Sequence, residues 1–218
     1  MSIQSLRCVV LFFAFAPFAS AETITYNVNV NTSSIAGTTG SLDLNFNPGP
    51  LVSQPASLQI LNFASNGTLA GGPTLTGDVA GALAAMLTFD NGTGFNDYFA
   101  DFTFGSAISF EVSLFGSAVS SPDGTSTSGS TFAFSMFLDP AGTVPALTTD
   151  LTNGFAATID VNLDGTATVT NFSKDTGISP VPEPSSGTAL IGTAIAIMRA
   201  LLWFRRPRRA RAAPIGET

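Results

Sequence analysis

The sequence contains no histidine and a single cysteine, Cys8, and these absences exclude several kinds of chemistry. Histidine is the commonest general base, and cysteine and histidine supply most zinc ligands. No glycine-rich phosphate-binding loop joins a predicted strand to a helix. A pair of carboxylates, as in glycosidases, is the remaining catalytic option, with Glu111, Asp97 and Asp101 as candidates. Such carboxylates on a solvated strand face usually serve as solubilising charge, so we expect a protein that is not an enzyme and has no catalytic residues.

Basic residues are almost as scarce between the two ends of the chain. From Glu22 to Pro184 there are fourteen acidic residues and one base, Lys174, a formal charge of −13, whereas the whole chain carries −7. Nucleic-acid binding requires clustered Lys and Arg side chains that neutralise phosphates. The composition therefore excludes nucleic acid as a partner of this region.

The first 21 residues have the layout of a secretory signal peptide. Arg7 precedes an apolar run from Val9 to Phe18, and the small residues Ala19 and Ala21 occupy the −3 and −1 positions of a cleavage site. We expect signal peptidase to cut before Glu22, the alternative being a buried N-terminal helix. Since Cys8 lies in the removed segment, the mature chain would have no cysteine and no disulfide.

The C-terminal forty residues combine three features. A Pro-rich linker, residues 179–186, contains Val181-Pro182-Glu183-Pro184. An apolar run of eighteen residues from Gly187 to Phe204 follows, long enough as a helix to cover about 27 Å of a bilayer core of about 30 Å. The basic tail, residues 205–218, contains Arg205, Arg206, Arg208, Arg209 and Arg211. Because basic flanks stay in the cytoplasm, the order predicts one transmembrane helix with the main domain outside; the alternative is an amphipathic helix on the membrane surface.

This order resembles the tail of PEP-CTERM proteins, exported bacterial substrates of exosortase-type membrane enzymes. The resemblance covers the signal peptide, Val181-Pro182-Glu183-Pro184, the apolar run and the arginine cluster, while the middle of the chain looks like small acidic β-rich members. It implies passage through the inner membrane of a Gram-negative-type bacterium, recognition at Pro182-Glu183-Pro184 and removal of the span. Delivery to the cell surface or to an exopolysaccharide matrix would follow. Arg199 departs from the pattern, because such spans are usually free of charge.

Residues 22–178 are predicted to form one all-β domain. Apolar and polar residues alternate with period two, which is typical of half-buried strands, at Tyr26–Val30, Leu42–Phe46, Ile108–Leu114, Phe132–Leu138 and Phe155–Leu163. Asp164-Gly165 and Asn66-Gly67 predict hairpins, and Val79 to Leu87 is a candidate for a short helix. Eight to ten such strands favour an antiparallel β-sandwich of jelly-roll or immunoglobulin-like type.

Two segments are candidates for binding calcium. Asp160-Val161-Asn162-Leu163-Asp164-Gly165 matches the start of an EF-hand loop, but its twelfth position is Asn171 instead of Glu, and the alternation favours a hairpin with Val161 and Leu163 facing the core. The second candidate is an irregular oxygen site in a Gly-rich loop, with the carboxylates Asp90, Asp97 and Asp101 and the amides Asn91 and Asn96 as donors. No cofactor and no metal are expected beyond this possibility of calcium.

The leading hypothesis is an exported surface or matrix protein with a structural or adhesive domain. The alternative is a carbohydrate-binding module of an exopolysaccharide matrix, and a polysaccharide hydrolase comes third. Sugar-binding surfaces normally expose aromatic rings, and the alternation assigns Tyr26 to the core, which leaves Tyr98 as the tyrosine available for stacking.

Overall fold

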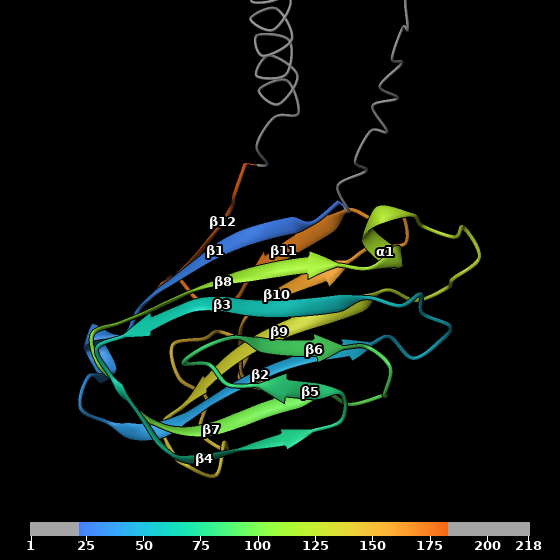
Figure 1. Ribbon diagram of the computed structural model, residues 1–218. Helices are drawn as coiled ribbons and strands as arrows, with labels where there is room; N and C mark the ends of the chain where they lie inside the picture. Colours follow the sequence, from blue (N-terminus) through green and yellow to red (C-terminus); the bar gives the residue numbers. More distant parts are fainter. Residues whose placement is uncertain (1–21, 183–218) are drawn as a thin grey trace, which may run out of the picture. The chain divides into compact units, whose positions relative to one another are not determined.

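The described part of the chain, residues 22–182 of a computed structural model, forms two antiparallel sheets of six strands each (Figure 1). The strand order of the first sheet is β12 (Thr176–Pro180), β1 (Ile24–Asn31), β8 (Ala107–Phe115), β3 (Ser57–Ser65), β6 (Leu87–Asp90) and β5 (Val79–Gly81). The order of the second sheet is β11 (Ala167–Asn171), β10 (Phe155–Val161), β9 (Ser130–Phe137), β2 (Thr39–Pro48), β7 (Asp97–Thr103) and β4 (Thr68–Thr76). Two short turns of helix, η1 (Ser33–Ile35) and α1 (Ser117–Ser120), complete the elements.

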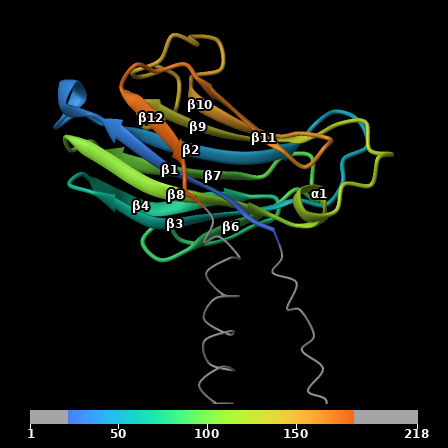
Figure 2. The same cartoon turned by 90° about the horizontal axis from the view of Figure 1, so that it is seen from above.

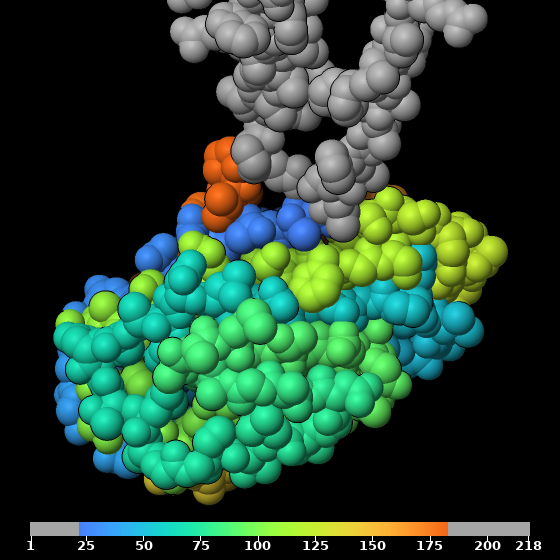
Figure 3. Space-filling view, in the orientation of Figure 1, coloured from blue at the N-terminus to red at the C-terminus, as the bar shows by residue number. Residues whose placement is uncertain are grey.

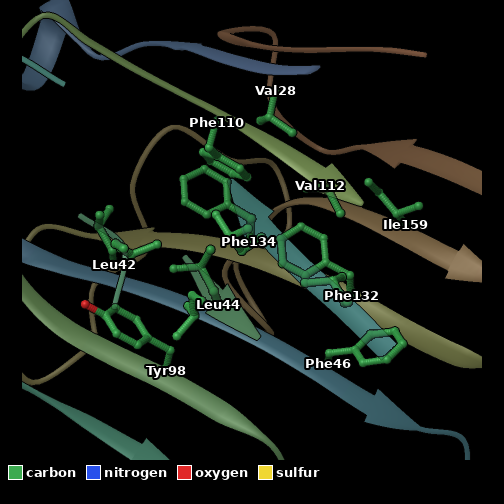
Figure 4. Packing of buried hydrophobic residues seen from close by; sticks show 14 of the residues in the cluster. Val28, Leu42, Leu44, Phe46, Tyr98, Phe110, Val112, Phe132, Phe134 and Ile159 are labelled. Atoms are coloured by element: carbon green, nitrogen blue, oxygen red, sulfur yellow. The ribbon is translucent and has the colours of Figure 1, made fainter. Parts of the chain in front are cut away.

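The two sheets lie face to face in a β-sandwich arrangement, and Figure 2 shows them as two layers. Alternate residues of each strand point into the core between them. Phe110 of β8 and Phe134 of β9 meet edge to face there, with their ring centroids 5.2 Å apart, and so join the first sheet to the second (Figure 4). The all-β class predicted from the alternation is therefore confirmed, with twelve strands where eight to ten were expected.

The predicted alternation agrees with burial along most strands. Its apolar positions are at most 8% exposed at Tyr26–Val30, Leu42–Phe46, Ile108–Leu114 and Phe132–Met136. The last apolar residues of two predicted strands depart from the expected burial, because Leu138 is 37% exposed and Leu163 is 50% exposed. Both residues follow the last residue of their strand, Phe137 and Val161, so neither faces the core.

Strand β9 is buried on both of its faces. Besides the inward Phe132, Phe134 and Met136, the outward Ala133, Ser135 and Phe137 are buried. The connection from β9 to β10 bonds to the end of β9, since the Leu138 N–H donates to the Val144 carbonyl and the Ala146 N–H to the Met136 carbonyl. This part of the second sheet therefore has no solvated face, in contrast to the simple alternation that we expected.

The predicted hairpin at Asn66-Gly67 is wrong. These residues connect β3 of the first sheet to β4 of the second, and β3 is bonded to β8 and β6 instead. Neither Asn66 nor Gly67 has the positive φ that a tight hairpin turn requires. The Asn66 side chain accepts hydrogen bonds from the Ser106 and Ala107 N–H groups, and so ties two sheet-to-sheet connections together.

The predicted helix at Val79 to Leu87 is also wrong. Val79–Gly81 forms β5 and pairs with β6, with Gly81 opposite Leu87. Gly81 has a φ of +99°, and a Cβ there would lie 2.0 Å from the Met86 carbonyl oxygen. Strand pairing at the edge of the sheet thus overrides the helix propensity of the alanines. In Figure 3 the teal and green atoms, which include β3, β5 and β6, form much of the surface on this side of the molecule.

The first and last strands of the domain are neighbours. Strand β12 pairs antiparallel with β1, from Val30 opposite Thr176 to Tyr26 opposite Pro180, and the Val181 N–H donates to the Thr25 carbonyl at 2.8 Å. Ser179 and Pro180 therefore belong to the sheet, and the expected linker from residue 179 begins too early. Pro180 is tolerated because β12 is an edge strand.

Several predicted features lie outside the described residues. They are the signal-peptide residues Ala19 and Ala21, the sorting residues Glu183 and Pro184, the apolar run 187–204 and the arginines from Arg205 to Arg211. Within residues 22–182, no helix is long and apolar enough to cross a membrane.

Candidate functional site

The three aspartates suggested for calcium do not come together. Asp90 ends β6 in the first sheet, where it accepts a hydrogen bond from the Ser57 hydroxyl. Asp97 and Asp101 both lie on β7 in the second sheet, four residues apart, which corresponds to about 13 Å along a strand. The weak site predicted from their closeness in sequence is therefore not formed.

The EF-hand-like segment is a hairpin, as the alternation predicted. Strands β10 and β11 pair with Val161 opposite Ala167, and the Asn162 N–H donates to the Thr166 carbonyl at 2.8 Å. Asp160 accepts a hydrogen bond from the Thr131 hydroxyl of the neighbouring strand, and Asp164 accepts one from the Thr166 N–H within the turn. The carboxylates of Asp160 and Asp164 thus form hydrogen bonds that stabilise the hairpin, and they are not arranged as ligands of one calcium ion.

The carboxylates considered for hydrolysis lie on different sheets. Glu111 is on β8 of the first sheet, between the buried Phe110 and Val112, so it points outward from that sheet. Asp97 and Asp101 lie on β7 of the second sheet. Because the core separates the outer faces of the two sheets, Glu111 cannot act together with either aspartate on one glycosidic bond.

Both tyrosines of the described residues are in the core. Tyr26 is 8% and Tyr98 2% exposed, and burial raises the pKa of each phenol. Figure 4 shows the Tyr98 ring beside Leu42 and Leu44. The expectation that Tyr98 could stack on a sugar is therefore wrong. The reason is the strand register, which places Tyr98 opposite the inward Leu44.

A shallow groove of about 340 Å³ lies at the end of the sandwich, lined in part by Pro50, Thr131, Asp160, Asn162 and Leu163. Its polar side chains are already bonded within the protein, since Thr131 donates to Asp160 and Asn162 donates to the Thr166 and Thr168 hydroxyls. Thr131 and Asn162 are therefore already engaged within the protein and are not held ready for a ligand.

A carboxylate pair that the sequence did not reveal, Asp43 of β2 and Asp97 of β7, lies on the outer face of the second sheet. Asp43 is opposite Phe99 and Asn45 is opposite Asp97, so the two aspartates are diagonal neighbours. Burial is the main cause that raises the pKa of Asp97 to about 8, and both a hydrogen bond to Asp43 and repulsion by its charge add to this. The protonated form of Asp97 is therefore favoured over that of an ordinary aspartate, and in that form Asp97 can donate to Asp43.

A ladder of side-chain amides continues from this pair along β2. Asn45 Nδ2 donates to Asp43 Oδ1 and Asn47 Nδ2 donates to Asn45 Oδ1, each at 3.3 Å. The backbone N–H of Asn96, the residue before Asp97, donates to Asn47 Oδ1 at 2.6 Å. The chain from Asp43 to Asn96 thus closes on the start of β7 and holds Asp97 next to β2.

Two buried side-chain oxygens on the strands next to β2 have no hydrogen-bond partner. They are Oδ1 of Asp97 and Oγ of Ser135, and Ser135 of β9 lies opposite Asp43 in the register of the sheet. Alternation could have indicated that Asp43 and Asn45 face outward together. It could not indicate that β7 and β9 flank β2, which is what brings Asp97 and Ser135 beside them.

The described residues contain no group of three or more Asp, Glu, His or Cys side chains placed to hold a metal ion. Comparisons with protein-family models, with characterised proteins and with solved structures give no match.

Proposed function

We propose that this chain is an exported cell-surface or extracellular-matrix protein, sorted by an exosortase-type enzyme, whose β-sandwich serves a structural or adhesive role without catalysis. The observation that carries the proposal is the order of segments in the sequence. A signal peptide with Ala19 and Ala21 begins the chain, and Val181-Pro182-Glu183-Pro184, the apolar run 187–204 and five clustered arginines follow the domain. Signal peptidase and the sorting enzyme are the proposed processing partners, and the apolar run would be the transmembrane helix.

The position of the last strand supports this proposal. Because β12 pairs with β1 and Val181 is bonded to Thr25, the first residue of the sorting motif directly follows the last hydrogen bond of the domain. Five residues, 182–186, separate that bond from the apolar run, and five extended residues span at most about 18 Å. The domain would therefore be held close to the membrane until the tail is removed.

The type of sandwich that we propose is a jelly roll. Most consecutive strands of the chain lie in different sheets: β1, β3 and β8 are in the first, whereas β2, β4, β7 and β9 are in the second. Such repeated crossing favours a jelly roll over an immunoglobulin-like sandwich, in which consecutive strands more often form hairpins.

The residues on which carbohydrate binding and hydrolysis were based are not arranged for those functions. Carbohydrate binding was based on Tyr98, which is buried, and hydrolysis on Glu111 together with Asp97 or Asp101, which lie on different sheets. A structural or adhesive role requires neither an exposed tyrosine nor a carboxylate pair across a substrate.

Substitution of Pro182, Glu183 and Pro184 together by alanine tests the sorting step. We expect export and signal cleavage to continue while a membrane-bound species that keeps its C-terminal tail accumulates, measured by immunoblotting of membrane, surface and medium fractions. Alanine at the neighbouring Ser185 and Ser186 is the matched control and should leave processing unchanged. If the motif variant reaches the surface or the medium with the size and yield of the parent, the tail is a permanent anchor and the proposal fails.

Export itself is tested at the signal peptide. Ala21→Phe places a bulky side chain at the −1 position and should leave the precursor uncleaved, because signal peptidase accepts only small residues there. Sequencing of the parent should show a mature N-terminus at Glu22; a start elsewhere by more than a few residues would contradict the predicted cleavage.

A further inference from the structure

We propose that Asp43, Asn45 and Asp97, on the outer face of the second sheet, bind a divalent cation of the calcium class. These residues come from β2 and β7, which are neighbours in that sheet. Their side chains share the outer face, because Leu44 of β2 and Tyr98 of β7 are the buried inward residues beside them. This site differs from the predicted trio of Asp90, Asp97 and Asp101, and only Asp97 is common to both.

Burial without a partner is the first reason for the proposal. Asp97 is 9% exposed, and its Oδ1 has no hydrogen-bond donor. Ser135, opposite Asp43, is 0% exposed, and its Oγ also lacks a partner. Removing such oxygens from water without a replacement destabilises the folded state. A cation between the two carboxylates would supply the missing partner of Asp97 Oδ1.

The second reason is the lack of any protein cation. Lys174 is the single basic residue between Glu22 and Pro182, and it lies in the connection from β11 to β12. Besides the contact between the two carboxylates, Asn45 Nδ2 donates to Asp43 Oδ1 at 3.3 Å. Since no other basic side chain exists among residues 22–182, a cation that bridges the two carboxylates must come from solution.

The donor atoms determine the kind of cation. Asp43, Asp97 and Asn45 offer carboxylate and amide oxygens, the hydroxyls of Thr76 and Ser135 flank them in the register, and neither sulfur nor imidazole is present. Such hard oxygen donors suit calcium or magnesium. Calcium is favoured because it accepts irregular coordination completed by water, whereas magnesium requires a near-ideal octahedron.

The test uses the purified full-length chain after chelation, at pH 7.5. Calcium binding is followed by calorimetric titration, and thermal unfolding is compared in calcium, in magnesium and in sodium at equal ionic strength. We expect saturable calcium binding and a rise of Tm that sodium does not reproduce. Asp97→Asn and Asp43→Asn should each weaken calcium binding by at least about tenfold. Asp101→Asn, an exposed carboxylate on the same strand, is the matched control and should bind like the parent.

Each contrary result overturns the proposal in a recognisable way. Absence of saturable binding, or equal weakening by Asp101→Asn, would show only general attraction to an acidic surface. A higher Tm of Asp97→Asn than of the parent, without any calcium response of the parent, would show that a proton occupies the pair. Circular dichroism establishes that each variant is folded, and because Asp43→Asn and Asp97→Asn are tested separately, failure of one to fold leaves the other to decide.

Discussion

Asn96 is a buried amide that connects three segments of the second sheet and its loops. Its Oδ1 accepts a hydrogen bond from the Asp78 N–H at 2.8 Å, and its Nδ2 donates to the carbonyls of Phe46 at 3.0 Å and Thr93 at 2.9 Å. Asn96 is 0% exposed, so water cannot replace these bonds. Because Asp97 follows directly, this residue also fixes the start of β7 and with it the position of the carboxylate pair.

Asn96→Ala should therefore lower the free energy of unfolding by about 2–4 kcal/mol, because backbone groups that it satisfies would remain buried without partners. Urea unfolding monitored by circular dichroism measures the change. Asn29→Ala, at an exposed position of β1, is the control and should change stability by less than about 0.5 kcal/mol. Similar effects of the two substitutions would show that the Asn96 hydrogen bonds contribute little.

Asp123 makes the stability of its own turn depend on pH. It accepts hydrogen bonds from the Ser126 and Thr125 N–H groups, each at 2.8 Å, and from the Ser126 hydroxyl at 2.9 Å. These donors lower the pKa of Asp123 to about 2. Since the folded-state pKa lies below the ordinary value of about 3.9, the turn is stabilised above about pH 4 and loses this stabilisation as the pH falls toward 2.

A carboxyl titration by NMR should give a midpoint of about 2 for Asp123. Ser126→Ala removes one donor and should raise that midpoint, whereas Ser120→Ala, whose hydroxyl donates to the Gly116 carbonyl, should not. A midpoint near 4 in the parent would mean that the turn does not persist in solution.

At the scale of elements, the β10–β11 hairpin depends on the backbone of one glycine. Gly165 has a φ of +83°, and its N–H donates to the Asn162 carbonyl at 3.1 Å to close the turn. A Cβ at this position would lie 2.8 Å from the Val119 carbonyl oxygen of α1. The turn is therefore constrained both by its own conformation and by contact with another connection of the sandwich.

Gly165→Ala should cost more than Gly124→Ala, which has a similar φ of +66° but no atom within 4 Å of its added Cβ. The strained φ costs about 1 kcal/mol in each case, and the contact with Val119 should add roughly 1–3 kcal/mol in the first. The difference between the losses in free energy of unfolding of the two variants measures the cost of the contact with Val119. Equal losses would indicate that α1 moves away without cost.

For the whole molecule, the closure of the chain by β12 decides where the domain ends. Strand β12 forms five register pairs with β1, and its Thr176 is buried. Without β12, β1 would become an edge strand with free backbone groups. The folded unit therefore extends to Val181, which is bonded to Thr25, and not only to residue 178 as the sequence suggested.

A chain of residues 22–175 should consequently be less stable than one of residues 22–182. Five lost cross-strand pairs at roughly 0.2–1 kcal/mol each correspond to about 1–5 kcal/mol. Thermal unfolding and analytical ultracentrifugation measure the loss and the self-association expected from the exposed β1 edge. Truncation without an effect on either would show that β12 is only loosely attached.

The sequence by itself determined the strand class and the direction of most side chains. Alternation at Leu42–Phe46 and Ile108–Leu114 identifies their buried faces, because side chains alternate with period two in any strand whatever its partners. The Asp164-Gly165 turn was likewise predictable, since both of its strands are adjacent in sequence and only the local turn geometry had to be inferred. The features on which the proposed sorting depends are likewise read from the sequence alone.

Only the tertiary structure decided which strands are neighbours. That choice turned Asn66-Gly67 into a sheet-to-sheet connection and Val79–Gly81 into an edge strand, and it placed Tyr98 in the core. It also brought Asp43 beside Asp97, residues that are far apart in the chain and share no local pattern. The physical reason is that strand pairing satisfies backbone hydrogen bonds between distant segments, which the period of one strand does not encode.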